Sequence, residues 1–145
     1  MATIEGYEMP DDLYYHQEHA WARVEDDDNV RVGMNDMFQE TAGDIVYVDL
    51  PFEGDEVGQG ETCGKIQSSK WIGKLIAPVA GEVIEVNEEL ESDSTVINSD
   101  PYDEGWIMLI RPSNLDEDLL GLMQGEAVED WLKEEIAKAE AEKKE

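Results

Sequence analysis

Residues 66 to 87 read IQSSKWIGKLIAPVAGEVIEVN, and Lys70 separates two apolar, alternating runs at this point in the chain. The runs, residues 61–68 and 75–86, have the period of β-strands, and a short polar link joins them as in a β-hairpin. A lone lysine in a turn is usually an ordinary solvated residue. The flanking context, with Pro78 eight residues further on, favours a hairpin that presents the amine of Lys70 to water, where an enzyme can acylate it.

The segments on either side of this hairpin repeat one pattern. Residues 43–49 read GDIVYVD, and residues 81–87 read GEVIEVN. Two such halves related by an approximate twofold axis would form a small flattened barrel or sandwich whose alternating apolar residues share one core. We expect Ile45, Val57 and Val83 in that core, and the lysine hairpin exposed at one end of it.

Three further segments carry a family resemblance that covers nearly the whole chain. They are YHQEHAWARVE at residues 15–25, VGMND at 32–36 with QETAGDIVYVDLP at 39–51, and INSDPYDEGWI at 97–107. Within the last of these, the run Asn-x-Asp-Pro-Tyr-x-x-Gly-Trp is a long and specific match. Together with the lysine hairpin, these segments resemble the H protein of the glycine cleavage system and the wider lipoyl and biotinyl carrier fold.

This resemblance implies a fold, a cofactor and a site. The fold is mainly β, a lipoyl/biotinyl-carrier-like flattened barrel (barrel-sandwich hybrid) with short helices that include a C-terminal helical segment. In the family, the lysine aligned with Lys70 carries lipoate in amide linkage, so we expect Lys70 to be the lipoyl attachment residue, loaded by a lipoate ligase or the lipoyl synthase machinery. Biotin is the competing group, but biotinyl lysines are typically bracketed by methionines, whereas Ser69 and Trp71 flank Lys70.

We expect the chain to be a carrier protein and not an enzyme. An intermediate tethered to Lys70 reaches successive active sites without diffusing away, so its effective concentration is set by the length of the arm. His16 and His19 lack a cysteine partner, which argues against zinc. The sequence has no phosphate-binding loop or nucleophilic serine motif, and its many carboxylates indicate no acid/base pair. We therefore expect no catalytic residue, no metal and a monomer.

Three positions depart from the pattern of glycine cleavage H proteins. Those proteins usually read Glu-Ser-Val-Lys-Ala at the site, where this chain has Gln67 in place of the glutamate. They usually carry an acidic residue just downstream, where this chain has Gly73-Lys74. Their His-Glu-Trp becomes His-Ala-Trp, with Ala20 in the middle. A carboxylate in the cleft would favour a cationic aminomethyl cargo, and Ala20 supplies none.

These departures resemble H-protein-like lipoate-binding proteins that serve heterodisulfide-reductase-like complexes in sulfur oxidation. The first hypothesis is therefore a lipoyl-Lys70 swinging arm that shuttles sulfur intermediates within such a complex. The alternative is a glycine cleavage H protein that works with glycine decarboxylase, aminomethyltransferase and dihydrolipoamide dehydrogenase. A third hypothesis, from another class of protein, is an unlipoylated scaffold or regulatory domain, which the intact mass at Lys70 would reveal.

The charge of the chain excludes several partners. With 10 basic and 37 acidic side chains, the formal net charge is −27. Nucleic acid is excluded because phosphates would be repelled, and anionic lipid is disfavoured for the same reason. Two explanations stay open. The acidic surface suits high salt, where screening removes the self-repulsion, or it steers the protein to basic clefts on its partners.

No run approaches the ~20 apolar residues of a membrane span, and the N-terminus lacks the basic and apolar regions of a signal peptide. We therefore expect no membrane insertion and a cytoplasmic protein. The single cysteine, Cys63, cannot form an internal disulfide, which fits a reducing compartment. Cys63 is either a small buried residue that fills space or a thiol close to the dithiolane on Lys70.

The domain plan is simple. We expect an N-terminal arm at residues 1–12, a single lipoyl-carrier domain at 13–138 and a charged C-terminal tail at 139–145. A chain of 145 residues needs only one such domain.

Within the domain, residues that typically begin or end helices and strands indicate where the remaining elements lie. A strand pair turns at the acidic run of residues 25–29. Asn35 is a plausible N-cap for a helical turn that Gly43 ends. Barrel strands follow, and then Asn114 is positioned to cap a leucine-rich helix. A second helix is expected from about Glu126 into the tail.

Overall fold

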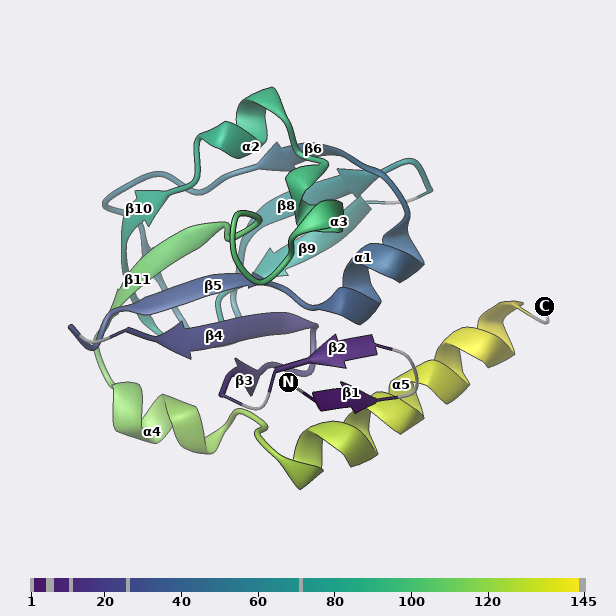
Figure 1. The fold of residues 1–145 in the computed structure, drawn as a ribbon. Coiled ribbons are helices and arrows are strands. Elements are labelled where there is room, and N and C mark those ends of the chain that lie inside the picture. Colours follow the sequence, from purple (N-terminus) through teal and green to yellow (C-terminus); the bar gives the residue numbers. More distant parts are fainter. Residues whose placement is uncertain (1, 5–6, 11, 26, 71, 144–145) are drawn as a thin grey trace.

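The computed structural model describes residues 2–4, 7–10, 12–25, 27–70 and 72–143 and contains three antiparallel sheets (Figure 1). A two-stranded sheet pairs β1 (Ala2–Ile4) with β2 (Tyr7–Met9). The six-stranded sheet has the order β3-β4-β5-β11-β10-β7. Its strands are β3 (Tyr14–Tyr15), β4 (Ala20–Val24), β5 (Val30–Met34), β7 (Glu56–Val57), β10 (Gly81–Val86) and β11 (Met108–Pro112).

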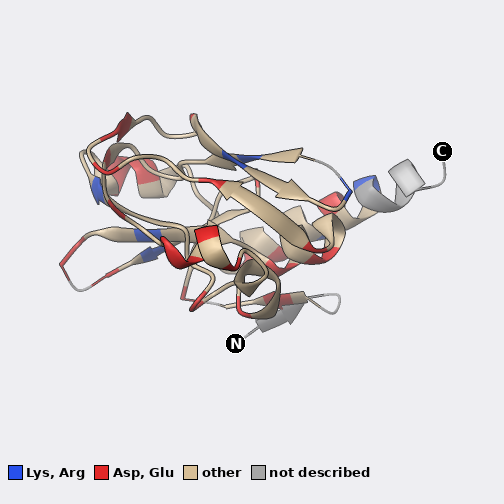
Figure 2. Cartoon of the chain, turned by 90° about the horizontal axis from the view of Figure 1, so that it is seen from above, with Lys and Arg blue, Asp and Glu red and all other residues tan. Residues whose placement is uncertain are grey.

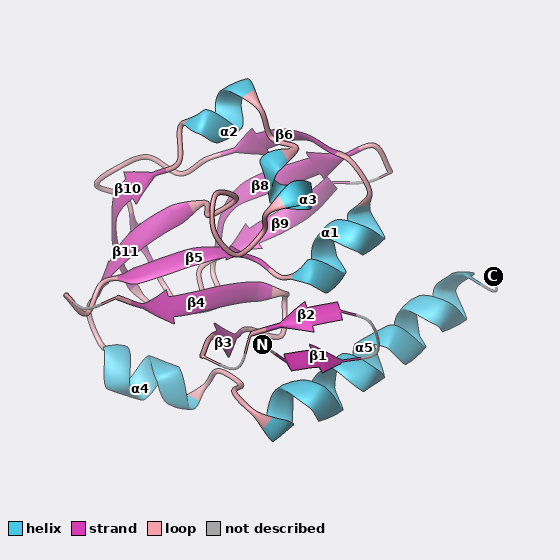
Figure 3. Ribbon diagram, in the orientation of Figure 1, coloured by secondary structure: helices cyan, strands magenta, loops and turns pink. Residues whose placement is uncertain are grey.

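The third sheet carries the lysine hairpin. It has the order β6-β8-β9, formed by β6 (Ile45–Asp49), β8 (Thr62–Ser68) and β9 (Ile72–Ile76). Figure 3 shows this sheet above β5 and β11, with α2, α4 and α5 at the edges of the molecule. The helices are α1 (Asp36–Ala42), α2 (Glu89–Ser92), α3 (Val96–Ser99), α4 (Leu115–Leu120) and α5 (Glu126–Lys143). The predicted mainly β architecture with short helices and a C-terminal helix is confirmed.

Both copies of the predicted internal repeat contain the same irregularity in the backbone. In β6, the pairing register shifts between Ile45 and Tyr47. In β10, it shifts between Val83 and Glu85, which are the equivalent positions of the second copy. A β-bulge in each strand bends it and re-aims its side chains. The two copies lie in different sheets, and Ile45, Val83 and Val57 meet in one buried cluster as expected.

One strand prediction is wrong. Residues 75–86 do not form a single strand, because β9 ends at Ile76 and β10 begins at Gly81 in a different sheet. Proline lacks a backbone N–H for a ladder, and Pro78 lies in the break between the two strands. The hairpin partner of β8 instead begins at Ile72, so strand pairing reaches closer to Lys70 than the sequence indicated.

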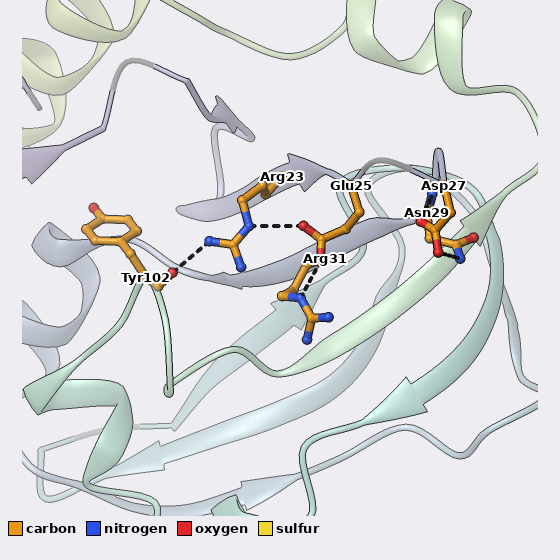
Figure 4. Close-up of polar contacts among 6 residues, drawn as sticks. All are labelled: Arg23, Glu25, Asp27, Asn29, Arg31 and Tyr102. Carbon is orange, nitrogen blue, oxygen red and sulfur yellow. Dashed lines mark hydrogen bonds and ion pairs between the residues drawn. The ribbon is translucent and has the colours of Figure 1, made fainter.

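The strand pair expected around the acidic turn is present as β4 and β5 (Figure 4). Glu25 accepts from Arg23 Nε at 3.3 Å and from Arg31 Nε at 2.9 Å. Asn29 donates to the carboxylate of Asp27 at the tip. Arg23 also donates to the backbone oxygen of Tyr102 at 3.1 Å. These bonds tie the hairpin to the segment that follows α3.

Capping was predicted correctly for α1 and incorrectly for α4. Asn35 Oδ1 accepts from the backbone N–H of Phe38 at 2.8 Å, and Gly43 ends the helix at a φ of 76°. Asn114 does precede α4, but within the described residues its side chain makes no cap bond to the helix backbone. It contacts the carboxylate of Glu117 instead, because that acidic side chain lies one turn away.

Both ends of the chain contain regular secondary structure. The described part of the predicted arm, residues 1–12, contains β1 and β2, and α5 extends into the predicted tail as far as Lys143. Helix α5 buries Val128 and Leu132 in a second apolar cluster, which includes Met9 from β2. Of the helices described, none is long and apolar enough to cross a membrane.

The second cluster depends on a close approach between β4 and β5. Trp21 is fully buried there, and its indole N–H donates to the backbone oxygen of Pro101 at 2.9 Å. A Cβ added at Gly33 would lie 2.6 Å from the Trp21 ring. Only glycine fits opposite this tryptophan.

Gly33→Ala should therefore lower the free energy of unfolding by about 1–3 kcal/mol, the usual cost of overpacking a core. Gly58→Ala is the matched control, because its added Cβ would come no closer than 3.5 Å to Glu61 and its φ is not positive. Urea unfolding followed by tryptophan fluorescence measures both variants. Equal stability of the two variants would contradict the packing argument.

Candidate functional site

Lys70 lies at the tip of the β8–β9 hairpin with its side chain exposed, as the sequence predicts. Gln67 and Ile72 are the last paired residues before the tip. The backbone N–H of Lys70 donates to Ser68 Oγ at 3.2 Å, and Ser68 itself is buried. The lysine therefore stands on a short link whose base is anchored inside the protein.

The link is also bonded to the segment between α1 and β6. The backbone N–H of Ser69 donates to the backbone oxygen of Asp44 at 2.9 Å. Gly43 lies beneath the lysine, since a Cβ added there would be 3.3 Å from Ser69 Oγ and 3.5 Å from Lys70 Cε. The positive φ of Gly43 favours glycine at this position.

Asn98, in α3, holds this supporting segment from both sides. Its Oδ1 accepts from the backbone N–H of Ile45 at 2.9 Å, and its Nδ2 donates to the backbone oxygen of Gly43 at 2.7 Å. The same nitrogen lies 3.3 Å from the side-chain oxygen of Gln39. Asn98 thus fixes the backbone that in turn receives the hydrogen bond from the lysine hairpin.

A surface pocket opens beside Lys70. It lies between the end of α1, the start of β6, β2 and α5, and it contains two exposed carboxylates, those of Glu40 and Asp44. Its apolar side is formed by Met37, Tyr7 and Ile136. The remaining lining residues are Gln39, Thr41, Gly43, Asn98 and Lys70. An acyl group attached to the lysine could fold into this pocket, and a cation at its end would meet negative charge.

The three departures from the pattern of glycine cleavage H proteins lie outside the lining of this pocket. Ala20 is fully buried in β4 and is not among the described residues that line the pocket. Gln67 and Lys74 are exposed on the β8–β9 hairpin. The prediction that position 20 sets the charge of the cleft is therefore not supported, because Glu40 and Asp44 supply carboxylates there. Trp71, which also flanks the lysine, lies outside the described residues.

A family model described as "Glycine cleavage H-protein" matches residues 13–135. The chain belongs to the glycine cleavage H-protein family. A protein of Thermococcus gammatolerans named "Probable glycine cleavage system H protein" is 46% identical, over 91% of this chain and 98% of its own length. A "Glycine cleavage system H protein" of Anaeromyxobacter sp. (strain K) is 44% identical, over 88% of this chain and 98% of its own.

A solved structure supports the same relationship. The crystal structure of a glycine cleavage system H protein from Mycobacterium marinum superposes with a TM-score of 0.69 at 37% sequence identity. The match covers 72% of this chain and 87% of that one. The predicted fold class, a lipoyl-carrier-like barrel-sandwich hybrid, is confirmed. H proteins of this family carry lipoate.

Cys63 has the surroundings of a residue that fills space. Its thiol is half-buried, 3.5 Å from the backbone oxygen of Leu75 and 3.8 Å from Met108 Sδ. Burial raises the pKa of the Cys63 thiol to about 12. A thiol with that pKa is protonated at neutral pH and is a poor nucleophile, so this geometry favours the structural interpretation over a redox role.

His19 also has structural surroundings. His19 Nδ1 lies 3.2 Å from the side-chain nitrogen of Asn35, and its Nε2 lies 3.1 Å from Glu135 in α5. His19 thereby links the N-cap of α1 to the C-terminal helix. Among the described residues, no group of three or more His, Cys, Asp and Glu side chains could hold a metal ion.

The exposed position of Lys70 at a hairpin tip was predicted from the sequence, but the residues that support the tip were not. Asn98 and Gly43 were both noted, one within a family motif and the other as a helix terminus, but neither was assigned to the site. The carboxylates of Glu40 and Asp44 were hidden among many others. The one available signal was that the Gly43–Asp49 segment repeats beyond the hairpin, which indicated that this segment and the lysine belong to one structural unit.

Asn98→Ala should lower the free energy of unfolding by about 1–3 kcal/mol, because it leaves the Ile45 N–H and the Gly43 oxygen without their partner. It should also speed hydrogen exchange at the Ile45 amide. Asn29→Ala is the matched control, since the side-chain amide of Asn29 bonds Asp27 at the far hairpin. If both variants exchange alike at Ile45, Asn98 does not support the site.

Proposed function

We propose that this chain is an H protein of the glycine cleavage system, and that Lys70 carries its lipoyl group in amide linkage. The single observation that supports this most is the position of Lys70, which is exposed at a hairpin tip and adjoins an acidic pocket. Family membership supports the choice of lipoate. The chain then acts as a carrier whose partner enzymes perform the chemistry.

The residues present fit an acylated lysine. Attachment joins Lys70 Nζ to the carboxyl carbon of an activated lipoyl donor: the amine lone pair forms the C–N bond, the bond to the activating group breaks, and the nitrogen loses a proton. Gly43 leaves room for the lysine stem. When attached, the dithiolane supplies a disulfide that accepts the aminomethyl group together with two electrons.

The two carboxylates of the pocket support a cationic cargo although position 20 carries no carboxylate. Glu40 lies in the C-terminal half of α1, and Asp44 follows Gly43, which ends that helix. An ammonium group beside a carboxylate gains a charge-assisted hydrogen bond, which is stronger than a neutral one. Met37 and Ile136 offer apolar surface to the chain of the arm. These features favour an aminomethyl cargo.

The sulfur-oxidation hypothesis receives no support from the comparisons. The relatives described above are named as glycine cleavage proteins. Ala20 is the departure that bore most directly on the cargo, and it lies in the core and outside the pocket lining. The partners that follow from the proposal are glycine decarboxylase, aminomethyltransferase and dihydrolipoamide dehydrogenase, rather than a heterodisulfide-reductase-like complex.

Lipoylated wild-type protein should support exchange of bicarbonate into the carboxyl group of glycine when glycine decarboxylase is added. Lys70→Arg should abolish this exchange, because arginine keeps the charge but cannot be lipoylated. Lys65→Arg is the matched control on the same hairpin and should retain the activity. A folded, lipoylated wild-type sample that gives no exchange would assign the arm to another complex.

A double variant, Glu40→Gln with Asp44→Asn, should lose a bound aminomethyl group about tenfold faster than the wild type. The reason is that one charge-assisted hydrogen bond contributes about 1.5–3 kcal/mol, and 1.4 kcal/mol is a factor of ten. Intact mass at successive times measures the loss. Asp116→Asn with Glu117→Gln, on α4, removes the same charge far from the pocket and should leave the rate unchanged; equal rates in both variants would contradict the role of the pocket.

A further inference from the structure

The lysine hairpin is the longest part of the chain without a carboxylate. Residues 62–81 contain three lysines and no Asp or Glu, in a chain that has 37 acidic residues. Figure 2 shows red acidic positions along most of the chain and few blue basic ones. The hairpin is therefore a local exception to a strongly negative molecule, and its charge calls for a separate explanation.

The outer face of the β6–β8–β9 sheet has two rows of exposed side chains. The row nearest the hairpin tip aligns Tyr47, Gln67 and Ile72 across the three strands. Tyr47 is 56% exposed and Ile72 is 66% exposed. The next row aligns Asp49, Lys65 and Lys74. Two apolar side chains, Tyr47 and Ile72, thus flank Gln67 beside Lys70, and the next row carries two lysines and one carboxylate, that of Asp49.

The lysines of this hairpin differ from the other basic residues in their partners. Over the part of the chain that the structure describes, Lys65, Lys70 and Lys74 have no carboxylate oxygen within 4.0 Å. Every other Lys or Arg whose side chain is described is in an ion pair, as Figure 4 illustrates for the two arginines at Glu25. Those residues are Arg23, Arg31, Arg111, Lys133 and Lys138.

We propose that this face, formed by Tyr47, Ile72, Lys65 and Lys74, is the docking surface for the enzyme that attaches lipoate to Lys70. That enzyme must bring its active site to the amine, which ends a stem of only four carbons. It cannot reach Nζ without covering the neighbouring hairpin surface. Enzymes that act on the finished arm meet the dithiolane at its far end, so they do not have to cover this row.

The surface also defines the chemistry of the attaching enzyme. Its contact region has an apolar depression for Tyr47 and Ile72, with carboxylates opposite Lys65 and Lys74. Complementary charges of this kind accelerate and orient association. The acidic remainder of the chain repels the same carboxylates, which limits docking to the hairpin. Gln67 removes from this face a negative charge that H proteins usually carry there, so this face is less negative than the family pattern.

This inference rests on the proposed lipoylation of Lys70, and its test separates the two. The assay is the initial rate of lipoylation by the purified lipoate ligase of the host organism, with ATP and lipoate, read by intact mass. Lys65→Glu with Lys74→Glu should lower kcat/KM at least tenfold, chiefly through KM. Lys133→Glu with Lys138→Glu changes the net charge equally on α5 and should match the wild type. Rising salt should slow the wild type and not the hairpin variant.

The apolar part of this face is tested by Ile72→Thr, which keeps a β-branched residue in the strand and should lower kcat/KM several-fold. Leu120→Gln is its control, because Leu120 is 86% exposed on α4. Wild-type rates in both hairpin variants would overturn the docking proposal and leave lipoylation intact. Normal lipoylation with impaired glycine exchange would assign the face to glycine decarboxylase and also overturn it. A folded wild type that is never lipoylated would overturn both proposals.

Discussion

The side-chain amide of Asn98 holds the backbone on both sides of Asp44, and the geometry of the site depends on this interaction. It accepts from the Ile45 N–H and donates to the Gly43 oxygen. The Asp44 oxygen is thereby placed to accept from the Ser69 N–H at the base of the lysine tip. The same segment supplies one wall of the pocket. Asn98 belongs to a family motif that is distant from Lys70 in sequence. It positions the lysine through the backbone of Gly43 and Ile45, to which it is directly hydrogen-bonded.

The hairpin around Lys70 differs in charge from the rest of the chain, which is strongly negative. A formal charge of −27 works against compactness unless salt or a partner offsets it. Among the lysines and arginines whose side chains the structure describes, those without a carboxylate oxygen within 4.0 Å all lie on the hairpin of Lys70, while Glu40 and Asp44 keep the adjacent pocket negative. The proposed acylation of Lys70 would remove its positive charge, so the tip would be neutral after loading. The hairpin would in this way present positive charge to the attaching enzyme, while the adjacent pocket presents negative charge to the cargo.

Local patterns were readable in the sequence, and long-range contacts were not. The hairpin and the N-cap at Asn35 follow from the order of residue types, so they were predicted. The repeat was visible because both copies face one core. Residues 75–86 were misjudged because their alternating pattern continues through a change of sheet at Pro78. The burial of Ala20 and the placement of the pocket carboxylates depend on which strands pair. Residue patterns along a single sequence do not indicate this pairing.

Of the three exposed lysines of this hairpin, we expect only Lys70 to be lipoylated. The most direct measurement is the mass of the proteolytic peptides that carry Lys65, Lys70 and Lys74, taken from protein purified from its native host. We expect a lipoyl group on Lys70 and none on Lys65 or Lys74. An unmodified Lys70, or a lipoyl group on either neighbouring lysine, would contradict it.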